Sequence, residues 1–154
     1  MKILTEFTEE QFSTLYEYMR PLWIETYGGF LPAEQIDFLL NKYFSEEGLR
    51  HYRAQGYQYR TIQGGGVLVY AERETDVYLD KLYLPPSARG KNIPKAIFDE
   101  LLTLGKDIVL NVNENNKRAV ACYLKNGFSI EERIEIPLEN GMVNCDYVMR
   151  KKAL

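Results

Sequence analysis

The sequence predicts an α/β (α+β) fold: a mixed, mostly antiparallel twisted sheet of six to seven strands, flanked by about four to five helices. Hydrophobic residues recur at helical spacing in the first third of the chain, whereas residues 57–84 alternate with a period of two. Helix, strand, helix and two further strands follow this meander. The length of 154 residues, with 45% hydrophobic and 27% charged side chains, fits one domain over residues 1–154.

The first third of the chain has clear helix start and stop signals. Thr8 is a good N-cap, and the Gly-Gly pair at 28–29 ends the segment. Pro21 lies inside this segment and should kink or split the helix. Pro32 opens a second helix, and residues 46–55 form a third helix or continue the second.

Seven segments have strand patterns, and tight turns separate several of them. They cover residues 1–5, 57–63, 67–74, 77–84, 107–112, 128–138 and 142–152. A run of three glycines predicts one hairpin, and Glu139-Asn140-Gly141 predicts another. Because a helical segment separates 77–84 from 107–112, we expect these two strands to pair in parallel through a right-handed crossover.

Charge and cysteine content exclude several classes of protein. The net charge of -3 disfavours nucleic acid or an anionic membrane as the main partner. Cys122 and Cys145 are too few for a disulfide framework and lack metal-ligand spacing, so no metal site is expected. No apolar run approaches a membrane span, and the start of the chain lacks a signal-peptide pattern. We therefore expect a cytoplasmic protein, monomeric or homodimeric.

The segment ARGKNIP joins the strand at 77–84 to the next helix. It is similar to a phosphate-binding turn in which Asn92 and Pro94 replace two glycines. A turn of this kind directs free backbone N–H groups and the helix dipole at one point, where Arg89, Lys91 and Lys95 add positive charge. The alternative is a plain strand-to-helix connection with solvated basic residues.

A second signature lies in the helix after the strand at 107–112. Its residues are Asn116, Ala119, Tyr123, Gly127 and Phe128. Together with the turn, this helix resembles the GCN5-related N-acetyltransferases (the GNAT family), whose turn has the pattern Q/R-x-x-G-x-G/A. The resemblance covers residues 57–150.

The resemblance implies an enzyme that moves an acetyl group from acetyl-CoA to a primary amine of a small molecule or peptide. The pyrophosphate would bind the amides of the turn, and the pantetheine would run beside one strand like an added strand, in the splay between two parallel strands. The implied cofactor-binding residues are Leu82, Tyr83, Leu84, Arg89, Gly90, Lys91, Asn92, Ile93, Pro94, Lys95 and Asn116.

The implied catalytic residues are Tyr123 and Asp80. Tyr123 would protonate the leaving thiolate, and its alternative is a core aromatic on the inner face of the helix. Asp80 is a candidate base, with Tyr83 as a weaker one. The alternative for Asp80 is a solvated side chain, because strict alternation places Tyr78, Asp80 and Leu82 on one face and Leu79, Lys81 and Tyr83 on the other.

The acceptor amine should bind between the first helices and the last hairpin. Trp23, Tyr27 and Phe30 are the predicted substrate-binding residues, and Tyr43 is a further candidate wall. Packing of the helices on the sheet is the alternative role for each of them. Glu25 could attract a cationic amine.

The two departures in the turn predict a weaker but real CoA site. Asn92 tolerates a left-handed conformation better than most residues, so the bend can survive. Pro94 has no N–H, and one lost charge-assisted bond lowers affinity roughly 10- to 150-fold. A catalytically idle GNAT-like domain that binds a ligand or partner protein is the alternative function. A nucleotide-binding module is disfavoured because the turn lacks a P-loop Lys-Ser pair.

Overall fold

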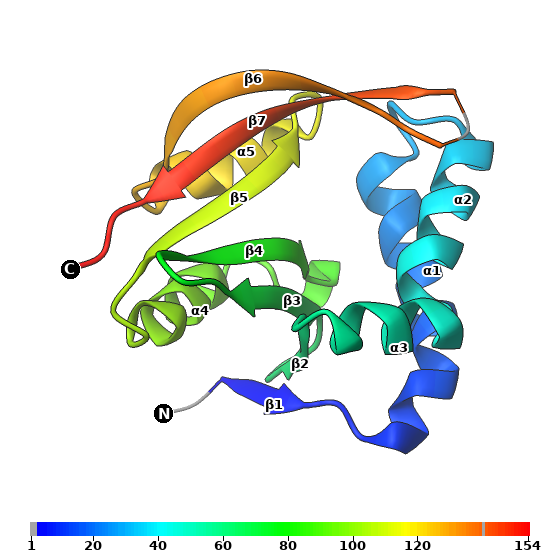
Figure 1. Cartoon of the computed structure of the whole chain (residues 1–154), viewed down its shortest axis with the longest axis horizontal. Coiled ribbons are helices and arrows are strands. Elements are labelled where there is room, and N and C mark those ends of the chain that lie inside the picture. Colours follow the sequence, from blue (N-terminus) through cyan, green and yellow to red (C-terminus); the bar gives the residue numbers. More distant parts are fainter. Residues whose placement is uncertain (1–2, 140) are drawn as a thin grey trace.

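A computed structural model describes residues 3–139 and 141–154, and these form one sheet with helices on both of its faces (Figure 1). The strands are β1 (Leu4–Glu6), β2 (Gln58–Ile62), β3 (Val67–Glu72), β4 (Asp76–Tyr83), β5 (Asp107–Asn113), β6 (Ser129–Pro137) and β7 (Val143–Lys151). The helices are α1 (Glu9–Tyr27), α2 (Ala33–Phe44), α3 (Glu46–Ala54), the 3-10 turn η1 (Pro86–Ala88), α4 (Ile93–Leu102) and α5 (Lys117–Lys125). The predicted α/β fold is confirmed.

The sheet has the order β1-β2-β3-β4-β5-β7-β6, and β4–β5 is its parallel pair. These two strands pair from Asp76–Asp107 to Leu79–Leu110 and then stop. Both strands continue beyond that point, to Tyr83 and Asn113, while they diverge (Figure 1). The sheet therefore opens between β4 and β5, and we call this opening the splay.

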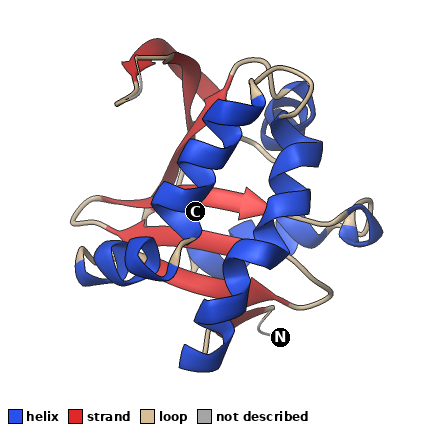
Figure 2. Cartoon of the chain, turned by 90° about the vertical axis from the view of Figure 1, so that its right-hand side faces the viewer, coloured by secondary structure: helices blue, strands red, loops and turns tan. Residues whose placement is uncertain are grey.

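Two hydrophobic clusters cover the two faces of the sheet. Val67 and Val69 on β3 pack with α1, α2 and α3, whereas Leu68 between them belongs to the cluster that includes α4 and α5. Since neighbouring strand residues point to opposite faces, the two sets of helices lie on opposite sides. Figure 2 shows α1 and α2 in front of the strands.

A β-bulge on β4 overturns the strict alternation expected there. Val69 pairs with Lys81 and Tyr70 pairs with Leu79, so Asp80 is the extra residue. An extra residue reverses the facing of everything after it. Leu82 consequently packs with the same cluster as Leu79, while Tyr83 joins the cluster of α1 to α3.

The local signals near the first helix are mostly confirmed. Thr8 caps α1 in a capping box with Gln11, and the helix ends at Gly28. The predicted split at Pro21 does not occur, and α1 is one helix. Met19 and Trp23 on either side of the proline are fully or almost fully buried, and their packing keeps both halves together.

Two predicted features extend beyond the described residues. Residues 1–2 of the predicted first strand and Asn140 of the predicted Glu139-Asn140-Gly141 turn lie outside them. The ends of β6 and β7 are joined by the Leu138 N–H, which donates to the Met142 carbonyl at 2.7 Å. Among the described residues, no helix has the length and apolar character needed to cross a membrane.

Candidate active site

A cavity of about 240 Å³ opens where the ARGKNIP turn, β4 and α5 meet, and we call it the turn cavity. Its lining residues are Thr26, Leu82, Tyr83, Leu84, Arg89, Gly90, Pro94, Asn116, Arg118, Ala119, Cys122 and Tyr123. Most of these residues are predicted cofactor-binding or signature residues. The structure therefore brings the two sequence signatures to one cavity, although they lie apart along the chain, at residues 88–94 and 116–128.

The turn keeps its bend without the glycines at 92 and 94. Asn92 adopts the left-handed conformation with φ 57°, and Gly90 has φ 74°. Pro94 lies in the first turn of α4, where its missing N–H would have no partner within the helix. The side of the turn formed by Lys91, Asn92, Ile93 and Lys95 does not line the cavity.

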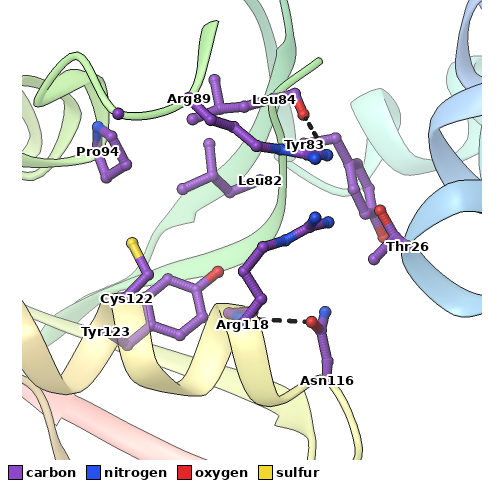
Figure 3. Close-up of a pocket in the computed structure, with 12 residues that line it drawn as sticks. Thr26, Leu82, Tyr83, Leu84, Arg89, Pro94, Asn116, Arg118, Cys122 and Tyr123 are labelled. Carbon is purple, nitrogen blue, oxygen red and sulfur yellow. Dashed lines mark hydrogen bonds between the residues drawn. The ribbon is translucent and has the colours of Figure 1, made fainter. Parts of the chain in front are cut away.

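Two arginines at the turn cavity are held by one carboxylate. Arg89 forms an ion pair with Glu25 and also donates to the Leu84 carbonyl at 3.0 Å (Figure 3). Arg118 Nη1 lies 3.3 Å from Glu25 Oε1. The hydrogen bond from Arg89 is the main cause that lowers the pKa of Glu25. Glu25 thus lies against the turn and α5 and lines neither this cavity nor the one described next.

A second cavity, of about 200 Å³, lies between the first helices and the last hairpin. We call it the aromatic cavity, because its walls include Trp23, Tyr27, Tyr43, Tyr78, Tyr83 and Tyr123. The predicted residue Phe30 does not line it, but packs edge-on against Tyr27 with a centroid distance of 5.7 Å. Ile136, Leu138 and Asn144 bring the β6–β7 hairpin into the wall, as expected.

The two cavities meet at the splay. They share Leu82, Tyr83, Asn116, Ala119 and Tyr123. Because β4 and β5 no longer pair at this depth, a molecule in one cavity can reach a molecule in the other through the sheet. A group-transfer reaction needs this arrangement, with donor and acceptor sites that meet at one point.

Tyr123 lies at that junction. It is 7% exposed, packs on Phe98 and Phe128, and its hydroxyl points from α5 toward the side of the cavity that Leu82 lines (Figure 3). Burial is the main cause that raises its pKa, and the neighbouring phenol of Tyr27 adds to it. The phenol therefore remains protonated at neutral pH and can donate a proton.

Asn116 fixes the loop before α5. Its side-chain oxygen accepts a hydrogen bond from the Ala119 N–H at 3.3 Å and so caps the helix (Figure 3). Asn116 lines both cavities.

Asp80 faces the aromatic cavity together with the residue that follows it. Lys81 Nζ lies 2.8 Å from Asp80 Oδ2 and 3.4 Å from the centroid of the Tyr43 ring. The bulge explains how two consecutive residues reach one cavity. Lys81 was not predicted as a site residue, since a regular strand would have turned it to the other face.

Tyr83 does not have the properties of a base. Its hydroxyl shares a 2.7 Å hydrogen bond with that of Tyr27. Burial raises the pKa of Tyr83 well above its ordinary value and that of Tyr27 to about 12. Both phenols therefore stay neutral and act as a fixed wall.

Asp146 on β7 is a second carboxylate in the aromatic cavity, and sequence reasoning missed it. Burial raises its pKa to about 6, with a further contribution from the charge of Glu114. The available signal was that Asp146 is the single charged residue in VNCDYVM, the part of β7 that precedes Arg150. A carboxylate with a raised pKa in a cleft is a functional candidate.

Comparisons with known proteins agree with this geometry. The model of the acetyltransferase (GNAT) family matches residues 12–128. The peptidyl-lysine N-acetyltransferase YjaB of Salmonella typhimurium is 39% identical over 62 residues, which are 40% of this chain and 43% of that relative. The match thus spans less than half of the relative's length.

Solved structures are similar over nearly the whole chain. The PaiA N-acetyltransferase of Thermoplasma acidophilum, in complex with coenzyme A, has a TM-score of 0.74 at 25% identity, with 99% of each chain covered. The spermidine N-acetyltransferase of Vibrio cholerae, in complex with CoA and spermine, has a TM-score of 0.63 at 18% identity, with 97% of this chain and 94% of that chain covered. The resemblance inferred from the turn and from the Tyr123 helix is confirmed, and the chain belongs to the acetyltransferase (GNAT) family.

Proposed function

We propose that this protein transfers the acetyl group of acetyl-CoA to a primary amine of a small molecule or peptide, with Tyr123 as the general acid. The observation that carries the proposal is the position of Tyr123 at the junction of two cavities. One cavity has the features of a site for the donor, and the other has those of a site for the acceptor.

The turn cavity fits acetyl-CoA. Arg89 and Arg118 supply positive charge for the pyrophosphate, and Leu82, Leu84 and Pro94 supply apolar walls for the pantetheine. The last residues of β4 have no partner strand across the splay, so their backbone groups can bond the pantetheine amides. When bound, acetyl-CoA supplies an activated acyl group and a thiolate leaving group.

The side chains of the protein carry out the proton transfers and keep water out. Tyr123 donates its phenolic proton to the sulfur as the thioester bond breaks. The buried phenol of Tyr83 and the half-buried phenol of Tyr27 limit access of water to the junction, which limits hydrolysis of the donor. The amine must reach the junction in its neutral form, and a free lysine-like amine has a pKa of about 10.4, so a base has to take one proton.

The similar proteins suggest two classes of acceptor. The Salmonella relative is a peptidyl-lysine N-acetyltransferase, and the Vibrio structure holds spermine. The charges in the aromatic cavity support the lysine side chain, because Lys81 already neutralises Asp80 and Asp146 remains for one ammonium group. A polyamine carries several charges and would need more carboxylates.

Calorimetry and turnover assays test the proposal. We expect acetyl-CoA and CoA to bind to the purified protein, followed by release of free thiol when a lysine peptide is added. Lysine peptide and spermidine should be compared at equal concentration, with the peptide as the better acceptor. Absence of binding at millimolar acetyl-CoA would refute the enzyme, while binding without any transfer would favour an idle ligand-binding domain.

Glu25→Gln should tighten CoA binding by about 5-fold at low salt, because the carboxylate competes with the pyrophosphate for Arg89 and Arg118. Calorimetric Kd values for CoA at two salt concentrations measure the effect, which should shrink at high salt. Glu17→Gln, an exposed glutamate on the same helix, is the matched control. Equal or weaker CoA binding in Glu25→Gln would show that the two arginines do not face the phosphates.

Pro94→Ala should tighten CoA binding by up to about 10-fold, because it restores one N–H in the first turn of α4. The Kd of CoA again measures the change. Pro86→Ala in η1 is the control, since Pro86 does not line the turn cavity. No gain in Pro94→Ala would mean that this backbone position does not reach the phosphates.

A further inference from the structure

The aromatic cavity holds three charged side chains, namely Asp80, Lys81 and Asp146. We propose that Asp146 receives the ammonium group of the acceptor and takes one of its protons before the amine attacks. The inference rests on the proposed function and assigns the base that the sequence had placed at Asp80.

Pairing distinguishes the two carboxylates. Asp80 is 2.8 Å from the buried ammonium group of Lys81, so that its charge is already compensated inside the protein. Among residues 3–139 and 141–154, Asp146 has no side-chain hydrogen bond or ion-pair partner, and the charge that acts on it comes from Glu114. An incoming cation therefore gains most at Asp146, because a half-buried carboxylate without a partner favours a new positive charge.

No neighbour among the described residues neutralises Asp146, which lines the aromatic cavity. Its strand partners are Asn113 on β5 and Ile134 on β6, neither of which is charged. The titratable or charged groups around it are Glu114, Arg133, Tyr27, Tyr78, Asp80 and Lys81. Arg133 is committed to Glu114 through bonds of 2.6 and 2.9 Å, and so does not neutralise Asp146.

The basicity of Asp146 suits proton transfer near neutral pH. Burial and the charge of Glu114 raise its pKa to about 6, so the carboxylate is ionised at pH 7 to 8 and is a better proton acceptor than an ordinary aspartate. Asp146 lines the aromatic cavity, and its raised pKa makes its carboxylate a stronger base than an ordinary aspartate.

Trp23, which lines the aromatic cavity, has a buried polar group without a partner in the described part of the chain. Its side chain is 3% exposed, and its indole N–H has no hydrogen-bond partner among the described atoms. Buried N–H groups are almost always satisfied.

The proton balance of the step is complete with these groups. Asp146 takes one proton from the ammonium group and later releases it to solvent. The C–N bond forms and the C–S bond breaks while Tyr123 gives its proton to the sulfur. The second proton leaves the nitrogen and restores the phenol of Tyr123, so each turnover releases one proton to solvent and one thiol.

Asp146→Asn tests the inference, with Asp37→Asn on the exposed side of α2 as the control. We expect kcat/KM for a lysine peptide to fall at least about 100-fold in Asp146→Asn, with unchanged CoA affinity. The wild-type profile of log kcat/KM should rise with pH up to about 6, and this limb should be absent from the variant. If Asp146→Asn has the same kcat/KM and the same pH profile as the wild type, the inference is overturned, while the proposed function remains intact.

Thermal stability separates a base from a structural residue. The raised pKa means that the folded protein favours the protonated form of Asp146. The resulting contribution to the free energy of unfolding is fully present below pH 4 and is lost as the pH rises through about 6. Asn imitates the protonated form. The Tm of Asp146→Asn should therefore exceed that of the wild type at pH 8 and match it near pH 4, whereas a residue needed for folding would lower the Tm at both.

A binding measurement decides the inference even if no turnover is found. Nα-acetyl-lysine amide should bind the CoA-loaded wild-type protein more tightly at pH 8 than at pH 5, and Asp146→Asn should bind it weakly at both. Equal binding by wild type and variant at pH 8 would overturn the assignment. The control Asp37→Asn should behave as the wild type at each pH.

Discussion

Tyr123→Phe should lower kcat about 10²- to 10⁴-fold while the affinity for acetyl-CoA stays within about two-fold of the wild type. The variant keeps the ring that packs on Phe98 and Phe128 and removes the hydroxyl alone. That hydroxyl has no hydrogen-bond partner among the described residues, so its loss leaves no buried group unsatisfied. Rapid-quench turnover at saturating acetyl-CoA, together with calorimetry, measures the two quantities separately.

The same substitution decides between the two roles of Tyr123. If it were a core aromatic and nothing more, Tyr123→Phe would retain both kcat and Tm. Tyr70→Phe on β3, outside both cavities, serves as the control. Acetyl thioesters of more acidic thiols give a further test, because a more acidic thiol leaves more readily without a proton. The loss of kcat in Tyr123→Phe should therefore become smaller as the pKa of the thiol falls.

Features fixed by local chain geometry were predictable from the sequence. The left-handed conformation of Asn92 follows from the tolerance of asparagine for positive φ. The parallel pairing of β4 and β5 follows from the helix between them. These inferences needed only residues close to one another along the chain.

Features that depend on distant contacts were not predictable in the same way. The bulge at Asp80 is invisible in a period-two pattern, and it alone places Lys81 beside Asp80 in the aromatic cavity. Asp146 is 66 positions beyond Asp80, and the fold of β7 beside β5 brings both to one cavity. The pairing of Glu25 with Arg89 likewise requires α1 to lie against the turn, which propensity and periodicity do not specify.

Lys81→Met should lower the free energy of unfolding by about 3 kcal/mol, because it removes one partner of a buried ion pair and leaves the charge of Asp80 behind. The side chains of Lys81 and Asp80 are 7% and 18% exposed. The larger exposure of Asp80 lets water relieve part of the cost, which places the effect at the lower end of the range for buried pairs. At about 2–4 °C per kcal/mol for a chain of this size, Tm should fall by roughly 6–12 °C.

The double variant Asp80→Asn/Lys81→Met tests whether the loss comes from the orphaned charge. It removes both charges and keeps similar shapes, so more than half of the lost stability should return. No recovery would mean that Lys81 stabilises the fold through its contact with the Tyr43 ring instead, which lies 3.4 Å from its ammonium group. The activity of the double variant then shows whether Asp80 or Asp146 is the base. If Asp80 is the base, the double variant should be as inactive as Tyr123→Phe. If Asp146 is the base, the double variant should keep a kcat/KM well above that of Asp146→Asn.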